Sequence, residues 1–107
     1  MPSPVYHDGM LYMVKDGGIV TALDAATGEV LKQGRTGVSS PYYASPIAAD
    51  GKIYLASLSG VVTVLKAGRD WKRLSEHDFG ERIMATPVVH QDRVYLRTES
   101  ALYCFER

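Results

Sequence analysis

The feature that most constrains how this chain can fold is an internal repeat of about 42 residues. In each of three copies, a proline after serine or threonine precedes a tyrosine by eight residues: Pro4 and Tyr12, Pro46 and Tyr54, Pro87 and Tyr95. A second block follows each copy, at Gly18–Leu23, Gly60–Leu65 and Ala101–Phe105, with alanine in place of glycine in the third. Repeats of this length are typical of arrays in which each unit buries its apolar face against its neighbours.

Within each unit the pattern predicts short β-strands joined by tight turns. Asp8-Gly9 and Asp50-Gly51 are two-residue hairpin signals, because both residue types tolerate positive φ, and Gln91-Asp92 is a weaker signal at the same place. No window shows sustained helical periodicity. The strands expected after these turns are Met10–Val14, Ile53–Ala56 and Val94–Leu96, then Ile19–Leu23, Val61–Leu65 and Leu102–Phe105, then Glu29–Lys32 and Trp71–Leu74.

Four short strands in each period are typical of a β-propeller blade. The repeated prolines agree, because the first residue of a strand tolerates a missing N–H. We therefore expect an all-β chain, a single propeller segment over residues 1–107 made of about three antiparallel four-stranded blades. Blade one covers residues 3–36, blade two 45–79, and a partial blade three 86–107 that lacks its outer strand.

Three blades cannot close a ring, since propellers use about four to eight. The open blade faces would expose apolar surface and strand edges. The sequence therefore predicts assembly, either with blades of a longer parent protein or with a second copy in a six-bladed ring.

The combined motif resembles the pyrroloquinoline-quinone-like (PQQ-like) repeat. It reads Ser-Pro-x-x-x-Asp-Gly-x-x-Tyr from Ser3, then Gly-x-x-x-Ala-Leu-Asp-Ala-Ala-Thr-Gly-Glu-Val-Leu from Gly18, and Leu23–Gly28 is its most specific part. That family includes quinoprotein dehydrogenases and a non-catalytic outer-membrane assembly lipoprotein. The resemblance covers nearly the whole chain and implies the C-terminal blades of a bacterial protein that is periplasmic or secreted. The first residues show no signal peptide.

One position departs from the pattern of that family. The repeat usually carries a tryptophan shortly after its Thr-Gly pair, and this residue docks on the neighbouring blade. Lys32 stands there in the first unit, whereas Trp71 begins the corresponding strand of the second. This departure predicts looser docking between the blades.

The overall charge and apolar content exclude some function classes. Twelve basic and twelve acidic residues give a formal net charge of zero, which leaves no electrostatic footprint for nucleic acid. No apolar run approaches the roughly 20 residues of a membrane span. The only cysteine, Cys104, has apolar neighbours, so we expect a buried and unreactive thiol.

The sequence favours a non-catalytic segment, with no catalytic, cofactor-binding or metal-binding residue. Enzymatic members of the family, as the resemblance implies, need calcium, an acidic base, a stacking tryptophan and usually a vicinal cysteine pair. This chain has one cysteine. Five of its aspartates lie in expected turns, where they favour local hydrogen bonds: Asp8, Asp16, Asp24, Asp50 and Asp92. His7 and His90 occupy the same repeat position two blades apart, and His77 stands alone, so we expect no shared metal.

Two functions follow from these observations. The first is a binding or interaction scaffold. The alternative is a fragment of a PQQ-dependent quinoprotein oxidoreductase, with PQQ and calcium held by residues outside this chain. A WD-type scaffold is a third interpretation, but the Gly-His and Trp-Asp dipeptides of that repeat are missing.

The best candidate binding residues lie in the segments that lead into the inner strands, because these segments usually line one mouth of a propeller channel. They are Tyr42, Tyr43 and Arg82, which offer aromatic area and a cation for an anionic group. For the two tyrosines, packing between the blades is the interpretation that we favour.

Overall fold

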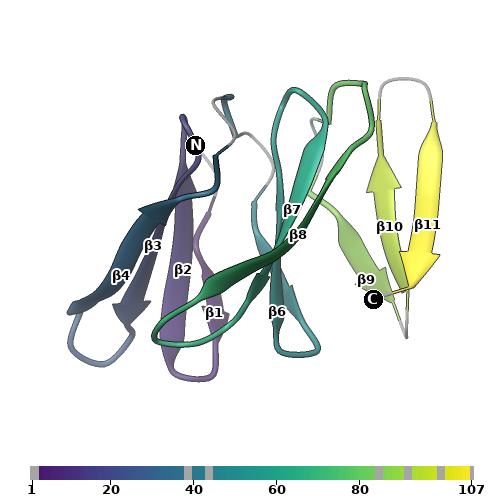
Figure 1. Ribbon diagram of the computed structural model, residues 1–107. Coiled ribbons are helices and arrows are strands. Elements are labelled where there is room, and N and C mark those ends of the chain that lie inside the picture. Colours follow the sequence, from purple (N-terminus) through teal and green to yellow (C-terminus); the bar gives the residue numbers. More distant parts are fainter. Residues whose placement is uncertain are drawn as a thin grey trace.

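The protein is an all-β array of three antiparallel sheets with four, four and three strands. The structure is a computed structural model that describes residues 3–37, 40–42, 45–83, 86–90, 93–98 and 101–106. The described residues contain no helix. The three sheets stand side by side in chain order (Figure 1). The expected fold class is confirmed.

Each sheet is a meander, in which consecutive strands are neighbours. The first sheet holds β1 (Val5–His7), β2 (Met10–Lys15), β3 (Ile19–Asp24) and β4 (Val30–Arg35). The second holds β5 (Ile47–Ala49), β6 (Lys52–Ala56), β7 (Val61–Lys66) and β8 (Lys72–Asp78). The third holds β9 (Val88–His90), β10 (Arg93–Arg97) and β11 (Leu102–Glu106). The outer strands β4 and β8 run further than the sequence predicted, to Arg35 and Asp78.

The first hairpin of each of the first two sheets has the expected chemistry. Asp8 and Asp50 have φ angles of 48° and 54°, and a glycine with positive φ follows each. A proline directly precedes β1, β5 and β9. Proline therefore marks the start of each inner strand, where no ladder hydrogen bond is lost.

The third sheet departs from the sequence alignment at its second hairpin. The N–H of Thr98 donates to the carbonyl of Ala101 at 2.9 Å, as Ser57 does to Val61 in the second sheet, also at 2.9 Å. Two residues separate the first pair and three separate the second. Ala101 is therefore the counterpart of Val61, not of the repeated glycine, because this hairpin is one residue shorter.

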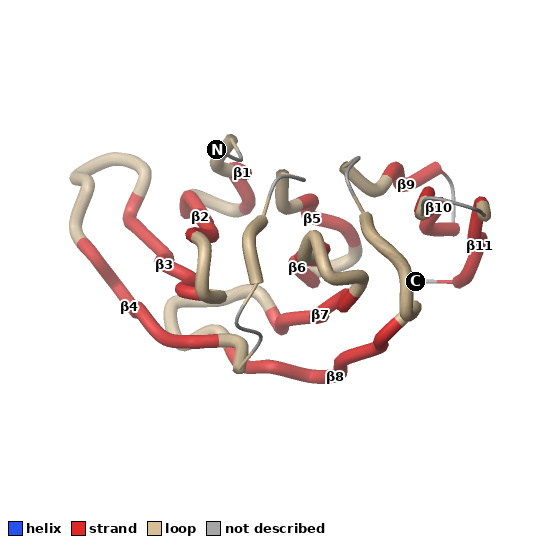
Figure 2. The backbone as a smooth tube through the Cα atoms, turned by 90° about the horizontal axis from the view of Figure 1, so that it is seen from above, coloured by secondary structure: helices blue, strands red, loops and turns tan. Residues whose placement is uncertain are grey.

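Viewed from above, the sheets fan out like part of a wheel. The inner strands β1, β5 and β9 lie along one side, and the outer strands β4 and β8 lie along the opposite side (Figure 2). The array measures 42 × 30 × 22 Å. The apolar core lies between the sheets: one cluster joins the first two sheets, and two clusters join the second and third. Each sheet is thus held mainly by the face that it shares with its neighbour.

Candidate functional site

A chain of hydrogen bonds joins the three sheets beside their inner strands. The N–H of Ser3 donates to the hydroxyl of Ser45 at 3.0 Å, and the N–H of Ser45 donates to the hydroxyl of Thr86 at 3.0 Å. Each of these residues directly precedes a repeated proline. We call this chain the hydroxyl belt. Sequence reasoning missed it, although the serine or threonine before each repeated proline was a visible signal.

Tyr42, a predicted channel-mouth residue, lies fully buried in the segment between β4 and β5. Its hydroxyl is 3.2 Å from the hydroxyl of Thr36, and its N–H donates to a carboxylate oxygen of Asp16 at 3.0 Å. Burial raises the pKa of the Tyr42 phenol. Ile83, also fully buried, holds the same place four residues before the next repeated proline. The structure therefore places Tyr42 in packing between the sheets, where it offers no surface to a ligand.

Arg82 is exposed, directly before Ile83. Tyr43, the third candidate, lies outside the described residues. The three residues are thus not brought together as one accessible cluster in the described part of the chain, and Arg82 is the candidate that solvent reaches there.

Trp71 connects the second sheet to the outer strand of the first. It is 4% exposed and belongs to the cluster between the first two sheets. The ammonium of Lys32 lies 4.6 Å from the centre of the indole ring, and it donates to the carbonyl of Trp71 at 2.6 Å and to Asp70 at 2.9 Å. The hydrogen bond from Lys32 to Asp70, together with the charge of Lys32, lowers the pKa of the Asp70 carboxyl.

This contact joins the two blades at the position for which the sequence predicted looser docking. Lys32 replaces the usual tryptophan, but its charge lies over the ring that Trp71 supplies from the facing sheet, which is a cation–π contact. A side chain at Gly34 would meet the same ring at 3.2 Å. Docking is thus close, with the aromatic residue on the opposite side of the interface.

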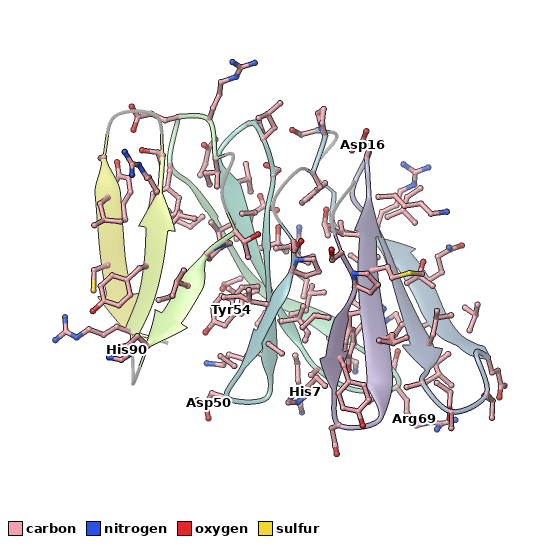
Figure 3. The ribbon with its side chains drawn as sticks, turned by 180° about the vertical axis from the view of Figure 1, so that it is seen from behind. His7, Asp16, Asp50, Tyr54, Arg69 and His90 are labelled. Carbon is pink, nitrogen blue, oxygen red and sulfur yellow. The ribbon has the colours of Figure 1, made fainter. Side chains whose placement is uncertain are left out.

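The repeated tyrosine also crosses between sheets. Tyr12 is fully buried, and its hydroxyl accepts the N–H of Gly68 from the second sheet at 2.8 Å. Burial raises the pKa of Tyr12 despite that hydrogen bond. Tyr54 holds the same position one repeat later, between the second and third sheets (Figure 3). In the first two repeats the tyrosine therefore packs toward the following blade.

The histidines do not form a metal centre within the described residues. His7 and His90 lie at the same edge of the array as Asp50, and Asp16 lies at the opposite edge (Figure 3). His77 lies in β8, and its ring is 4.4 Å from that of Phe79. The described ranges hold no group of three or more histidine, cysteine, aspartate or glutamate side chains that could bind a metal ion.

The third sheet presents an uncovered face on the side away from the second sheet. Val88 is 59% exposed on this face and Leu102 is 70% exposed. Cys104 is exposed as well, so the prediction of a buried thiol was wrong. The reason is the alternation of the strand: Tyr103 points toward the second sheet and packs on Phe79, so its neighbour Cys104 points away.

No helix in the described residues is long and apolar enough to span a membrane.

Comparison with known proteins supports the fold. BamB from Moraxella catarrhalis superposes with a TM-score of 0.77 at 19% identity, covering 96% of this chain and 32% of that chain. The quinohemoprotein alcohol dehydrogenase ADHIIG from Pseudomonas putida HK5 superposes with a TM-score of 0.79 at 18% identity, covering 98% of this chain and 18% of that chain. A europium-containing methanol dehydrogenase superposes with a TM-score of 0.69 at 22% identity, covering 87% of this chain and 19% of that chain.

The chain therefore spans about a third or less of each of these solved structures. No curated protein sequence matches it. The family model described as outer membrane protein assembly factor BamB matches residues 1–107. Because this match covers the full sequence, the protein belongs to the PQQ-like repeat family that includes BamB.

Proposed function

We propose that this chain is a non-catalytic propeller segment that serves as an interaction scaffold. The observation that carries the proposal is the uncovered face of the third sheet, where Val88 and Leu102 are 59% and 70% exposed. Exposed apolar surface of this kind is typical of a surface that another protein covers. The family description, an outer membrane protein assembly factor, agrees with a role in protein assembly.

We propose residues 1–107 as one segment with blades at 3–36, 45–79 and 86–107. Further blades complete the ring, supplied by copies of the chain or by a longer parent protein. Its environment is the periplasm or the cell exterior, by analogy with the outer membrane named in the family description. Arg82 is the proposed contact for a small or peptidic ligand, and Tyr43, which lies outside the described residues, stays a candidate from the sequence.

The alternative is a fragment of a quinoprotein oxidoreductase. Its support is the similarity of the fold to ADHIIG, with a TM-score of 0.79. In that case PQQ and calcium would be held mainly by residues outside this chain. Trp71 is the single indole available for stacking on a quinone. Its ring already lies against Gly34 and Lys32, which supports the packing role.

Reconstitution with PQQ and calcium tests whether this chain itself takes part in quinone binding. The chain is incubated with both, and free quinone is removed by gel filtration. The scaffold proposal predicts that no quinone absorbance elutes with the protein. Retained absorbance that is lost again in Trp71→Phe would contradict it, because the tryptophan would then serve as a quinone platform.

A further inference from the structure

The chain carries two uncovered sheet faces, one at each end of the array. The first, which we call the tail face, is the side of the third sheet that points away from the second sheet. The other, which we call the head face, is the side of the first sheet that points away from the second. Strand pairing assigns to the tail face Val88, His90, Arg93, Tyr95, Arg97, Leu102 and Cys104. It assigns Leu11, Met13, Ile19 and Leu23 to the head face.

We propose that the tail face of one copy of this chain docks on the head face of a second copy, and that two such contacts close a ring of two copies. The inference rests on the proposed scaffold function and names its partner. Docking of unlike faces is a heterologous contact, which closes only when the rotation between copies allows it.

The tail face repeats the residue types of a face that the chain itself buries. Tyr95 is paired with Val88 and Cys104, as Tyr12 is paired with Val5 and Ala22 in the first sheet. Leu102 likewise corresponds to Val20 by its pairing. Tyr12, Val20 and Ala22 are fully buried against the second sheet. Apart from Arg93 and Arg97, the tail face therefore has the apolar pattern of an interface, and no sheet in the described part of the chain covers it.

The head face repeats the residue types that cover such a face. Leu11 pairs with Leu23 in the first sheet as Ile53 pairs with Leu65 in the second. Ile53 and Leu65 are fully buried against the first sheet. Leu11 and Leu23 are half-buried, with no sheet against them. The chain thus carries both halves of its own internal interface, one at each end.

The hydroxyl belt also has two matching ends. Within the described residues, the N–H of Thr86 has no acceptor and the hydroxyl of Ser3 has no donor. Inside the chain, an N–H at this position donates to the hydroxyl of the next repeat at 3.0 Å. A second copy docked by its head face would present Ser3 to Thr86 in the same relation. The belt would then continue from one copy to the next.

Three differences make the contact between copies weaker than the contacts within one chain. Arg97 takes the place of Val14 and Ala56, and Arg93 takes the place of Met10, so two charges stand on the tail face. The guanidinium of Arg93 lies 3.8 Å from the sulfur of Cys104 on this face. Gly28 takes the place of Trp71, so the head face lacks the indole that joins the first two sheets. We therefore expect an assembly that depends on protein concentration. The formal net charge of zero does not oppose association of like chains.

Complementation between two variants tests the proposal. Leu102→Asp disrupts the tail face, Met13→Asp disrupts the head face, and Leu74→Asp is the matched control on the exposed outer strand β8. Molar mass is followed by light scattering over a concentration series. The wild type and the Leu74→Asp control should rise from 11.8 kDa to twice that mass, and each face variant alone should stay at 11.8 kDa.

An equimolar mixture of the two face variants should again reach twice the chain mass. One intact pair of faces remains in the mixture: the tail face of the Met13→Asp copy and the head face of the Leu102→Asp copy. A mixture that stays monomeric while the wild type associates would overturn head-to-tail docking and leave the scaffold function standing. A wild type that is monomeric throughout, or that grows beyond two copies, would overturn the closed pair.

A variant that associates more tightly than the wild type complements the variants that lose association, because a failure to fold would also cause that loss. Arg97→Val gives the tail face the residue that Val14 supplies inside the chain. We expect self-association about tenfold tighter than in the wild type, because an apolar side chain replaces a desolvated charge. A folding defect would give open-ended aggregation instead of a mass that stops at two copies, and unchanged or weaker association would count against the tail face.

Discussion

Gly60 shows how a single residue sets the distance between two blades. Its φ is +102°, and a Cβ built there would collide with the carbonyl oxygen of Glu81. The carbonyl of Gly60 also accepts the N–H of Phe79 at 2.8 Å. The segment between β8 and β9 therefore rests directly on the backbone of the preceding hairpin. Glycine is required here both by backbone conformation and by space.

We predict that Gly60→Ala destabilises the protein more than Gly51→Ala does. Gly51 has a φ of +70° with nothing within 4 Å of its added Cβ, so its cost is the left-handed strain of about 1–2 kcal/mol. Gly60→Ala adds a backbone clash, for which overpacking gives about 1–3 kcal/mol more. Denaturant unfolding of both variants measures the difference. Equal losses would show that the segment is free to move away.

At the residue scale, the sequence predicted conformations better than environments. Asp8 and Asp50 adopt the positive φ that their Asp-Gly turns imply. The burial of Tyr42 agrees with the packing that the sequence favoured. The exposure of Cys104 did not follow from its neighbours in the sequence, because burial depends on which side of a strand faces another sheet. Successive side chains of a strand point to opposite faces of its sheet, and only the packing of neighbouring sheets shows which face is covered.

At the scale of elements, the contact between the first and second sheets depends on the residues that bridge them. Trp71 stands directly before β8, and Lys32 lies in β4 of the facing sheet. Arg73 of β8 adds a hydrogen bond to the carbonyl of Thr36 at 3.0 Å. The outer strand of the second sheet is therefore tied to the first sheet at its beginning.

We predict that Trp71→Ala costs about 3–5 kcal/mol of unfolding free energy, the range for removing a large buried aromatic side chain. Leu74→Ala, on the same outer strand and 51% exposed, should change it by less than about 0.5 kcal/mol. Urea denaturation of the three proteins checks both values. A loss below about 1 kcal/mol for Trp71→Ala would mean that the indole does not hold the two sheets together.

Strands that a nearby proline or Asp-Gly turn marks were predictable from the sequence, whereas contacts between residues on different sheets were not. The inner strands after each proline and the strands after each Asp-Gly turn lie where the sequence placed them. The docking of Trp71 on Lys32 was missed because the aromatic residue and its partner lie 39 residues apart, on different sheets. The shorter second hairpin of the third sheet was missed because the sequence repeat aligned Ala101 with the repeated glycine. The hydrogen bonds of the hairpin align Ala101 with Val61 instead.

At the scale of the whole molecule, the fold is quasi-one-dimensional, because each sheet contacts only its neighbours in the array (Figure 2). Stability in such arrays is approximately a sum of unit and neighbour terms. The middle sheet is covered on both faces, whereas the first and third sheets are covered on one. The repeat predicted this arrangement, since its period alone indicates stacked units. What covers the end faces is not encoded in the period.

Hydrogen–deuterium exchange at two protein concentrations tests the central claim that both end faces are interfaces of the kind the chain already buries. In dilute solution, amides of β6 and β7 should exchange slowest, because opening them exposes two faces rather than one. At high concentration, protection should rise in β2 and β3 and in β10 and β11 together. Protection that is equal in all three sheets when dilute, or that rises only along β8, would contradict the claim.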